Sequence, residues 1–368
     1  MKKIILTFAI PSIIMTSAHA ATLFQTSNGS NLNLYGHVRA DLTDAGHGTK
    51  GTAVGNSKQG DLTTTALLGI QGQKHVNNDV TLFTKGEWQV AGQSSDGNKF
   101  FPRKVYVGAD FGKGGTLTIG QHHDLIYTSL IHAVDIFDEW GKGTMKGIYG
   151  KTFQPSQVVY SNNIGNLDIM TSYQFRNSDG LDKGGIDLFA PSTTPETVQD
   201  NAYAIAAIYH TNLGLNLHAA YARQNYGYSS FAKNSDGKID TYGAGADYNL
   251  NALYMSFIYI GSKTNTGEAS KNLLYINTYN LVASYQIDQY KLYTGYGIQH
   301  RNGSEISSIG YTPIKSYKLG VQYFVTPLTK VWLEYRHNNG DLKPEDNFDD
   351  STLGYAKNEI ALTGQYNF

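Results

Sequence analysis

Three carboxylates lie close together in the stretch 135–141, which reads Asp-Ile-Phe-Asp-Glu-Trp-Gly. They are Asp135, Asp138 and Glu139, and they belong to residues 121–154, the longest interruption between the strands predicted below. A connection of this length inside a compact fold is usually functional or disordered. Because apolar and aromatic residues interleave with the acids, we expect an anchored segment. An outer loop with ordinary solvated acids is the alternative.

The other polar residues form no catalytic pattern that we can assemble. The chain has 11 His but no Cys, and it contains no G-x-S-x-G, H-E-x-x-H, P-loop or EF-hand sequence. His122, His123 and Asp124 are adjacent, but neighbouring residues of an extended chain point to opposite faces, which argues against a metal site. We therefore expect no enzyme activity, no cofactor and no metal.

Residues 1–20 have the layout of a secretory signal. Two lysines precede an apolar stretch that is too short to span a bilayer, and Ala18 and Ala20 form an A-x-A-like cleavage site. A hydrophobic first strand is the alternative, but Pro11 and the switch to polar residues argue against it. We expect residues 21–368 to form a single exported domain.

Composition restricts the class of this exported domain. The 29 basic and 30 acidic residues nearly cancel, so nothing suggests a nucleic-acid partner. Beyond the signal, no apolar run approaches the roughly 20 residues that a membrane helix needs. A transmembrane β-barrel remains possible, because only alternate residues face lipid and the hydrophobic signal is diluted. The 27 Tyr residues fit this class, since aromatic rings with a polar tip favour bilayer interfaces.

Apolar and polar residues alternate in many segments of the chain. In 290–299, for example, Tyr290, Leu292, Tyr296 and Ile298 share one face, while polar residues and glycines lie on the other. This period of two predicts amphipathic strands. About sixteen are predicted, near 32–43, 61–73, 79–91, 102–111, 115–121, 155–162, 166–175, 201–211, 215–226, 239–248, 252–261, 274–286, 290–299, 314–325, 328–337 and 357–368.

The connections between these strands alternate between long and short. This arrangement is typical of a meander with tight periplasmic turns and longer outer loops, and an even strand number lets the last strand close against the first. Closure also satisfies backbone groups that would be costly to leave unpaired in lipid. The sequence therefore predicts an all-β fold, a 16-stranded antiparallel transmembrane β-barrel. A soluble β-sandwich or β-propeller is the alternative.

Short motifs along the chain resemble those of the trimeric general porins of Gram-negative bacteria. The stretch 34–37 resembles their first strand, and 103–120 resembles their fourth and fifth strands. The ending 359–368 resembles their closing strand, with Phe368 as the terminal residue and Tyr366 among its alternating apolar positions. The resemblance covers essentially the whole mature chain. It implies an outer-membrane homotrimer in contact with lipid, whose ending is read by the barrel-assembly machinery.

The resemblance also gives the acidic segment a place. In these porins the third loop folds into the barrel and narrows it, and 138–142 resembles the tip of that loop. Asp135 and Glu139 match the two acids of the constriction, with Asp138 beside them, and Glu87 matches an inward-facing acid of the third strand. These four carboxylates are the acidic half of the expected site.

A facing wall of cations should complete the constriction and create a transverse field. The resemblance assigns this wall to His37 and Arg103, and alternation adds Arg39 to the face of His37. Leu67 stands where the family has an arginine, and Lys104 would face inward instead of Arg103 if its strand were shifted by one residue. Because this wall is incomplete and a histidine is largely neutral at pH 7, we expect a weak preference for cations. Wall residues without effect on selectivity are the alternative.

Three functions are compatible with these observations. The first is a general diffusion pore that passes ions and small hydrophilic solutes passively. The second is a substrate-selective channel, for example for sugars, although such channels usually have about eighteen strands and a ladder of aromatic residues in the lumen. The third is an outer-membrane enzyme, which would need a catalytic constellation that the sequence does not offer. The first is the prediction.

Overall fold

The computed structural model describes residues 21–45, 61–91, 100–141, 144–145, 148, 153–176, 197–228, 237–265, 273–303, 313–339 and 358–368. The predicted signal segment, residues 1–20, lies outside the described residues, so its removal stays a prediction.

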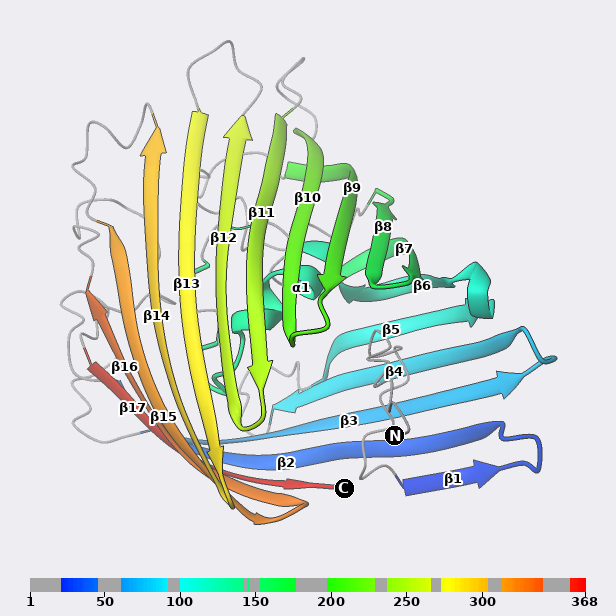
Figure 1. Ribbon diagram of the computed structural model, residues 1–368, viewed down its shortest axis with the longest axis horizontal. Coiled ribbons are helices and arrows are strands. Elements are labelled where there is room, and N and C mark those ends of the chain that lie inside the picture. Colours follow the sequence, from blue (N-terminus) through cyan, green and yellow to red (C-terminus); the bar gives the residue numbers. More distant parts are fainter. Residues whose placement is uncertain are drawn as a thin grey trace.

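Antiparallel strands make up nearly all of the described chain (Figure 1). The first nine are β1 (Ala21–Gln25), β2 (Asn31–Ala45), β3 (Asp61–His75), β4 (Thr81–Ala91), β5 (Phe100–Asp110), β6 (Thr116–His123), β7 (Phe153–Ile164), β8 (Leu167–Gln174) and β9 (Thr197–His210). The others are β10 (Leu215–Tyr228), β11 (Gly237–Leu250), β12 (Leu253–Asn265), β13 (Leu273–Ile287), β14 (Tyr290–Gly303), β15 (Ile314–Thr326), β16 (Thr329–Asn339) and β17 (Asn358–Asn367).

The strands β2 to β17 form a closed barrel of sixteen, as the sequence predicts. Each pairs with the next along the chain, and β17 pairs with β2, with Leu362 opposite Leu42. Closure leaves no open edge between the first and the last strand of this sheet. Every predicted strand is present, although its ends differ from the prediction by a few residues.

The short strand β1 was not predicted. It pairs with residues 31–34 of β2, whereas β17 pairs with residues 37–45 of the same strand. There Gly36 and Phe368 exchange two backbone hydrogen bonds, Gly36 N to Phe368 O at 2.9 Å and Phe368 N to Gly36 O at 3.0 Å. The beginning and the end of the described chain therefore lie in line along the same side of β2.

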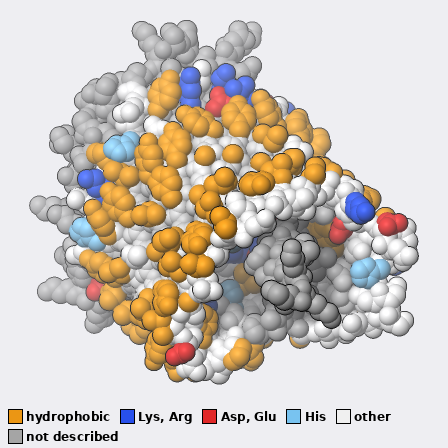
Figure 2. Space-filling model, viewed as in Figure 1, with side chains coloured by type: hydrophobic (Ala, Val, Ile, Leu, Met, Phe, Trp, Pro, Cys, Tyr) orange, Lys and Arg blue, Asp and Glu red, His pale blue; other side chains and the backbone are white. Residues whose placement is uncertain are grey.

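Alternation along the strands separates an apolar outer face from a polar inner face. On β15 the outward Leu319 is 58% exposed while the inward Ser316 is fully buried. On β17 the outward Leu362 is 47% exposed while the inward Thr363 is fully buried. Hydrophobic side chains spread over the outer face that Figure 2 shows. This is the arrangement that a strand between lipid and an aqueous lumen requires.

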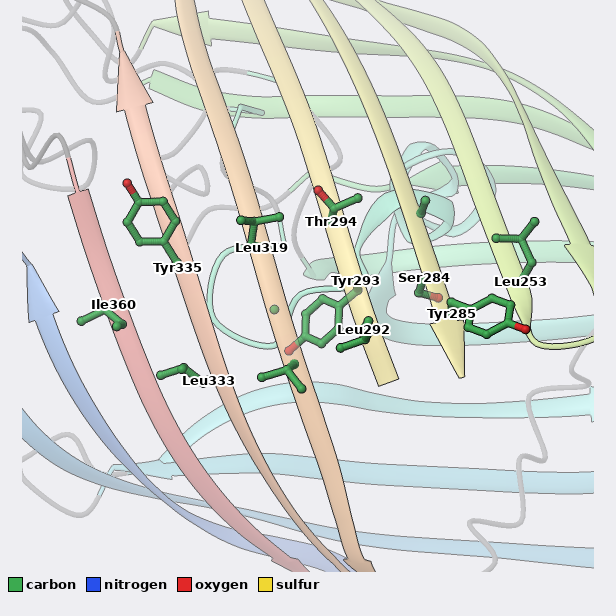
Figure 3. Close-up of a pocket in the computed structure, with 13 residues that line it drawn as sticks. Leu253, Ser284, Tyr285, Leu292, Tyr293, Thr294, Leu319, Leu333, Tyr335 and Ile360 are labelled. Carbon is green, nitrogen blue, oxygen red and sulfur yellow. The ribbon is translucent and has the colours of Figure 1, made fainter. Parts of the chain in front are cut away.

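A shallow concavity of about 530 Å³ lies on this outer face across β12 to β17 (Figure 3). Its walls include Leu253, Leu292, Leu319 and Leu333, and Thr294 lies between them. The Thr294 hydroxyl donates to the Lys318 carbonyl at 3.1 Å, so this polar group is satisfied within the sheet. The concavity is therefore part of the apolar outer surface and not of the barrel interior.

Three short helical segments occur in the described chain. The 3₁₀ helix η1 (Gly112–Gly114) forms the tight turn between β5 and β6. The helix α1 (Leu125–Ser129) and the 3₁₀ helix η2 (Ile131–Val134) belong to the connection between β6 and β7 and pack on the inner side of β8 to β13. No helix within the described residues has the length and apolar character needed to cross a membrane.

Candidate functional site

The connection between β6 and β7, here called the third loop, enters the barrel and packs on its inner wall. Asp124 begins α1 by accepting a 2.8 Å hydrogen bond from Ile126 N, and its complete burial raises the pKa of this carboxyl to about 6. Leu125, Ile126 and Leu130 are buried against the barrel. The facing wall presents small residues: Ala202, Ala204, Ala206, Ala220 and Ala222.

Glycines of the wall allow the loop to approach more closely still. A Cβ atom on Gly243 would lie 2.7 Å from Leu130 Cδ1, and one on Gly295 would lie 2.9 Å from Phe137 Cε2. Both distances are too short for carbon atoms in contact. Small wall residues on β9, β10, β11 and β14 therefore leave the space that the loop occupies.

The tip of the third loop is held by a buried carboxylate of β16. Glu334, which is fully buried, accepts hydrogen bonds from Asp138 N at 2.8 Å and Glu139 N at 3.1 Å. The Tyr293 hydroxyl donates a third bond at 2.9 Å to the same carboxylate. Lys318 Nζ donates to the next two loop carbonyls, Trp140 O at 3.0 Å and Gly141 O at 3.2 Å. Charged groups of β15 and β16 thus bind the backbone of the loop tip.

The side chains at the tip form ion pairs with two further cations of the wall. Arg39 Nη2 lies 2.9 Å from both carboxylate oxygens of Glu139, and Arg39 Nε lies 2.9 Å from Asp41. Lys330 Nζ lies 3.1 Å from Asp138 Oδ1. Burial raises the pKa of Glu139 although Arg39 opposes this shift. The pairs join the loop tip to β16 and β2.

A second charged cluster surrounds Glu87 on β4. This carboxylate accepts a 2.8 Å hydrogen bond from the Tyr35 hydroxyl, and Arg103 Nε lies 3.1 Å from it. Lys104 Nζ and Lys85 Nζ are 3.7 and 3.9 Å away. Three cations therefore share one buried acid, which leaves this part of the wall positively charged.

A β-bulge explains how two adjacent residues of β5 both reach Glu87. Lys104 pairs with Glu87 and Pro102 with Trp88, so Arg103 is the extra residue in the ladder. The extra residue breaks the alternation of sides. Strict alternation predicts that only one of Arg103 and Lys104 faces inward, but both are directed at the same inward-facing carboxylate.

A column of stacked rings connects this cluster with the third loop. The Arg103 guanidinium lies 4.9 Å from the Phe153 ring centre, and the Phe153 and His123 rings are 4.0 Å apart. His123 stacks on Tyr127 at 3.7 Å, and the Tyr127 hydroxyl donates to Asp135 at 2.7 Å. Asp135 is therefore oriented by a contact within the loop and is joined through the rings to the wall near Arg103.

The structure brings together some of the predicted site residues and separates others. Arg39 contacts Glu139, and Arg103 contacts Glu87, so acids and bases that we expected to face each other across an opening form direct pairs. His37 lies on β2 opposite Leu67 of β3 and belongs to neither pair. At the end of the chain, Phe368 closes the barrel seam, and Tyr366 is 51% exposed on the outer face.

Five charged residues of the site do not follow from the sequence-based prediction: Asp41, Lys85, Lys318, Lys330 and Glu334. Alternation was the available signal for all five, because each lies on the polar face of a strand that the sequence predicts. The contacts of Lys318 and Glu334 with the third loop required the fold, since nearly two hundred residues separate Glu334 from its partners.

Comparison with known proteins agrees with this architecture. A sequence profile described as "Gram-negative porin" matches residues 9–343 of the chain. The chain belongs to the Gram-negative porin family. The porin is 23% identical to outer membrane porin F of Salmonella typhimurium strain SL1344, with all of both chains covered. It is also 23% identical to outer membrane porin PhoE of Citrobacter freundii, with 99% of each chain covered.

Solved structures give the same result for the fold. The porin superimposes on Salmonella typhi OmpF, solved as a complex with daunomycin, with a TM-score of 0.74 at 18% identity, covering 95% of this chain and 100% of that one. The trimer form of OmpT from Vibrio cholerae gives a TM-score of 0.66 at 15% identity, covering 92% and 99%. The porin is accordingly a multi-pass β-barrel of the outer membrane, and it functions as a diffusion channel.

Proposed function

We propose that this porin passes ions and small hydrophilic solutes through an opening bounded by the third loop and the inner wall of β2 to β5. The observation that carries the proposal is the attachment of the loop tip to the barrel. Glu334 and Lys318 hold its backbone, and Arg39 and Lys330 pair with Glu139 and Asp138. A loop tip held by residues of β2, β15 and β16 narrows the lumen.

The charge balance supports weak ion selectivity. The contacts described above involve six carboxylates and six cationic side chains, so the formal charges of these twelve groups cancel. The thinner basic wall read from the sequence predicts a weak preference for cations, and Lys85, Lys318 and Lys330 reduce the size of that preference. The twelve groups are Asp41, Glu87, Asp135, Asp138, Glu139, Glu334, Arg39, Lys85, Arg103, Lys104, Lys318 and Lys330.

The working unit in the membrane is proposed to be a homotrimer. One similar solved structure, OmpT of Vibrio cholerae, is titled as a trimer form. The large apolar outer face of this chain offers surface both for lipid and for neighbouring barrels (Figure 2). Oligomers of this kind should conduct in groups of three equal steps. The ending at Phe368 is proposed to be the feature that the barrel-assembly machinery reads.

Planar-bilayer recording together with liposome swelling tests this function. We expect conductance that rises in proportion to salt concentration, a small reversal potential in a salt gradient, and swelling rates that fall smoothly with sugar size. Absence of conductance would contradict the proposal. Saturable block of the current by one sugar would favour a substrate-selective channel instead.

A further inference from the structure

A hydrogen-bonded network of histidines and acids lies on the inner wall of β8 to β11, away from the clusters described above. His210 ends β9 beside the short turn to β10. Its Nε2 lies 2.7 Å from Asp168 Oδ2, and its Nδ1 lies 2.8 Å from Asn216 Oδ1. Asp168 and Asp247 are almost fully buried, with side-chain exposures of 3% and 8%, whereas the His210 side chain is 26% exposed.

The orientation of Asn216 follows from its second partner. Asn216 Nδ2 donates to Asp247 Oδ2 at 2.8 Å, so Asn216 Oδ1 faces His210. A rotated amide would place its oxygen against the Asp247 carboxylate, where two acceptors repel each other. The amide group therefore presents an acceptor to His210 Nδ1.

Both ring nitrogens of His210 consequently face acceptors. A neutral imidazole carries one N–H group, so it can donate only one of these two bonds, whereas an imidazolium donates both. The carboxylate of Asp168 adds an electrostatic reason for the charged form. We infer that His210 is a fixed cation of the lumen wall near the periplasmic mouth and that its charge lowers the cation preference of the pore.

The neighbouring ionisable groups define the local charge. His218 Nε2 lies 2.6 Å from Asp247 Oδ1, and its Nδ1 has no hydrogen-bond partner among the described residues, so a neutral ring that donates through Nε2 satisfies this contact. Among the described residues, His132 of η2 lies near Asp247 and His218, and Tyr254 of β12 lies near Asp247. A charged His210 balances one of the two negative charges of Asp168 and Asp247. Without that charge the two carboxylates would attract cations.

The charge of His210 is tested by nuclear magnetic resonance of the full porin labelled with ¹⁵N-histidine in lipid nanodiscs. The His210 signals, assigned by their absence in His210→Gln, should show both ring nitrogens protonated at pH 7. In Asp168→Asn, His210 should lose its second ring proton at a lower pH than in the wild type when the pH is raised. A neutral His210 ring at pH 7 in the wild type would overturn the inference, whether or not the porin conducts.

The effect on transport is tested by reversal potentials in a potassium chloride gradient. One lumen charge about 10 Å from the ion path should change the permeability ratio by about 1.5-fold. His210→Gln should therefore raise the ratio of potassium to chloride permeability at pH 7. In the wild type we expect this ratio to rise at alkaline pH as His210 loses its proton, and the variant should lack that rise. Unchanged values in this variant would overturn the role in selectivity.

His75→Gln is the matched control. His75 also lies at the short-turn end of a strand, but its Nδ1 contacts the Thr81 hydroxyl at 2.8 Å, a group that either donates or accepts. This contact does not require a charged ring, so the control should keep the wild-type permeability ratio at both pH values.

Discussion

Most charged side chains described in the lumen form direct ion pairs or hydrogen bonds. The effect of each on ion selectivity therefore depends on the charge of its partners. Glu87 illustrates this, because Arg103, Lys104 and Lys85 surround one carboxylate and leave the cluster positively charged. Individual surface ion pairs contribute little to stability, but their net charge still acts on ions that pass close by. Selectivity should therefore respond to single substitutions that stability tolerates.

Arg103 and Lys104 provide a direct test of the β-bulge. If both side chains face the lumen, Arg103→Gln and Lys104→Gln should each raise the ratio of potassium to chloride permeability, by about 1.5-fold for one charge near the path. Reversal potentials measure this ratio. Lys74→Gln serves as the control, because Lys74 is exposed near the turn that follows β3. An effect of only one of the two substitutions would show that the strand alternates without a bulge.

Glu139 should give the selectivity a dependence on acid pH. Burial raises the pKa of this carboxyl, so on acidification it takes up a proton at a higher pH than an ordinary glutamate would. Protonation removes a negative charge and leaves Arg39 with less compensation, so cation permeability should fall as the pH is lowered. Reversal potentials between pH 7 and pH 4 measure the change.

Glu139→Gln should show the low-pH behaviour already at pH 7 and lose that part of the pH dependence. Asp79→Asn, a substitution in an exposed short turn, should retain it. An identical pH profile in Glu139→Gln and the wild type would exclude Glu139 as the titrating group.

At the scale of elements, the strands were largely predictable and their irregular parts were not. Alternation marks a strand whenever one face meets lipid and the other meets water, which explains why all sixteen barrel strands were found. The strand β1 has only five residues, all exposed, and depends on free backbone groups of β2 beyond the C-terminus. The bulge at Arg103 depends on the register of the partner strand. Neither feature has a local signal in the sequence.

The third loop was located from its length and its acids, but its contacts with the wall were not predictable. Alanines occupy every second position on the inner face of β9 and β10. This pattern in the sequence indicates a segment packed closely against these strands, because small side chains leave room for it. The ion pairs of Glu139 and Asp138 with distant strands required the closed barrel, because no spacing in the sequence relates them.

Gly295 should be essential for the position of the third loop. In Gly295→Val the new side chain would overlap Phe137, whose Cε2 lies 2.9 Å from the position of a Cβ atom. Overpacking of this kind costs about 1–3 kcal/mol, so the tip should leave its seat and change the single-channel conductance. In Gly364→Val no heavy atom of the described residues lies within 4 Å of the added Cβ, and conductance should stay at the wild-type value. Equal conductance in all three proteins would show that the loop does not rest on this wall.

At the scale of the whole molecule, the barrel is closed by its two described ends. Phe368 exchanges two backbone hydrogen bonds with Gly36, and β1 continues the same line along β2. This seam leaves no unpaired edge between β17 and β2, and unpaired backbone groups in lipid would be costly.

Deletion of Phe368 should weaken this closure. Two hydrogen bonds of about 0.5–1.5 kcal/mol each would be lost, so the free energy of unfolding in lipid vesicles, measured by urea titration, should fall by about 1–3 kcal/mol. Phe368→Leu keeps the backbone bonds and should lose less. Equal stability of the deletion and the wild type would show that the seam does not depend on the last residue.

The central claim is that the tip of the third loop borders the conducting path. Because the chain has no Cys, Asp138→Cys introduces a single thiol at a side chain that is 32% exposed. Single-channel recording before and after addition of a bulky water-soluble thiol reagent is the most direct measurement. We predict a stepwise loss of current in Asp138→Cys and no loss in Leu362→Cys, whose side chain lies on the outer face. Full modification of Asp138→Cys with unchanged current would contradict the claim.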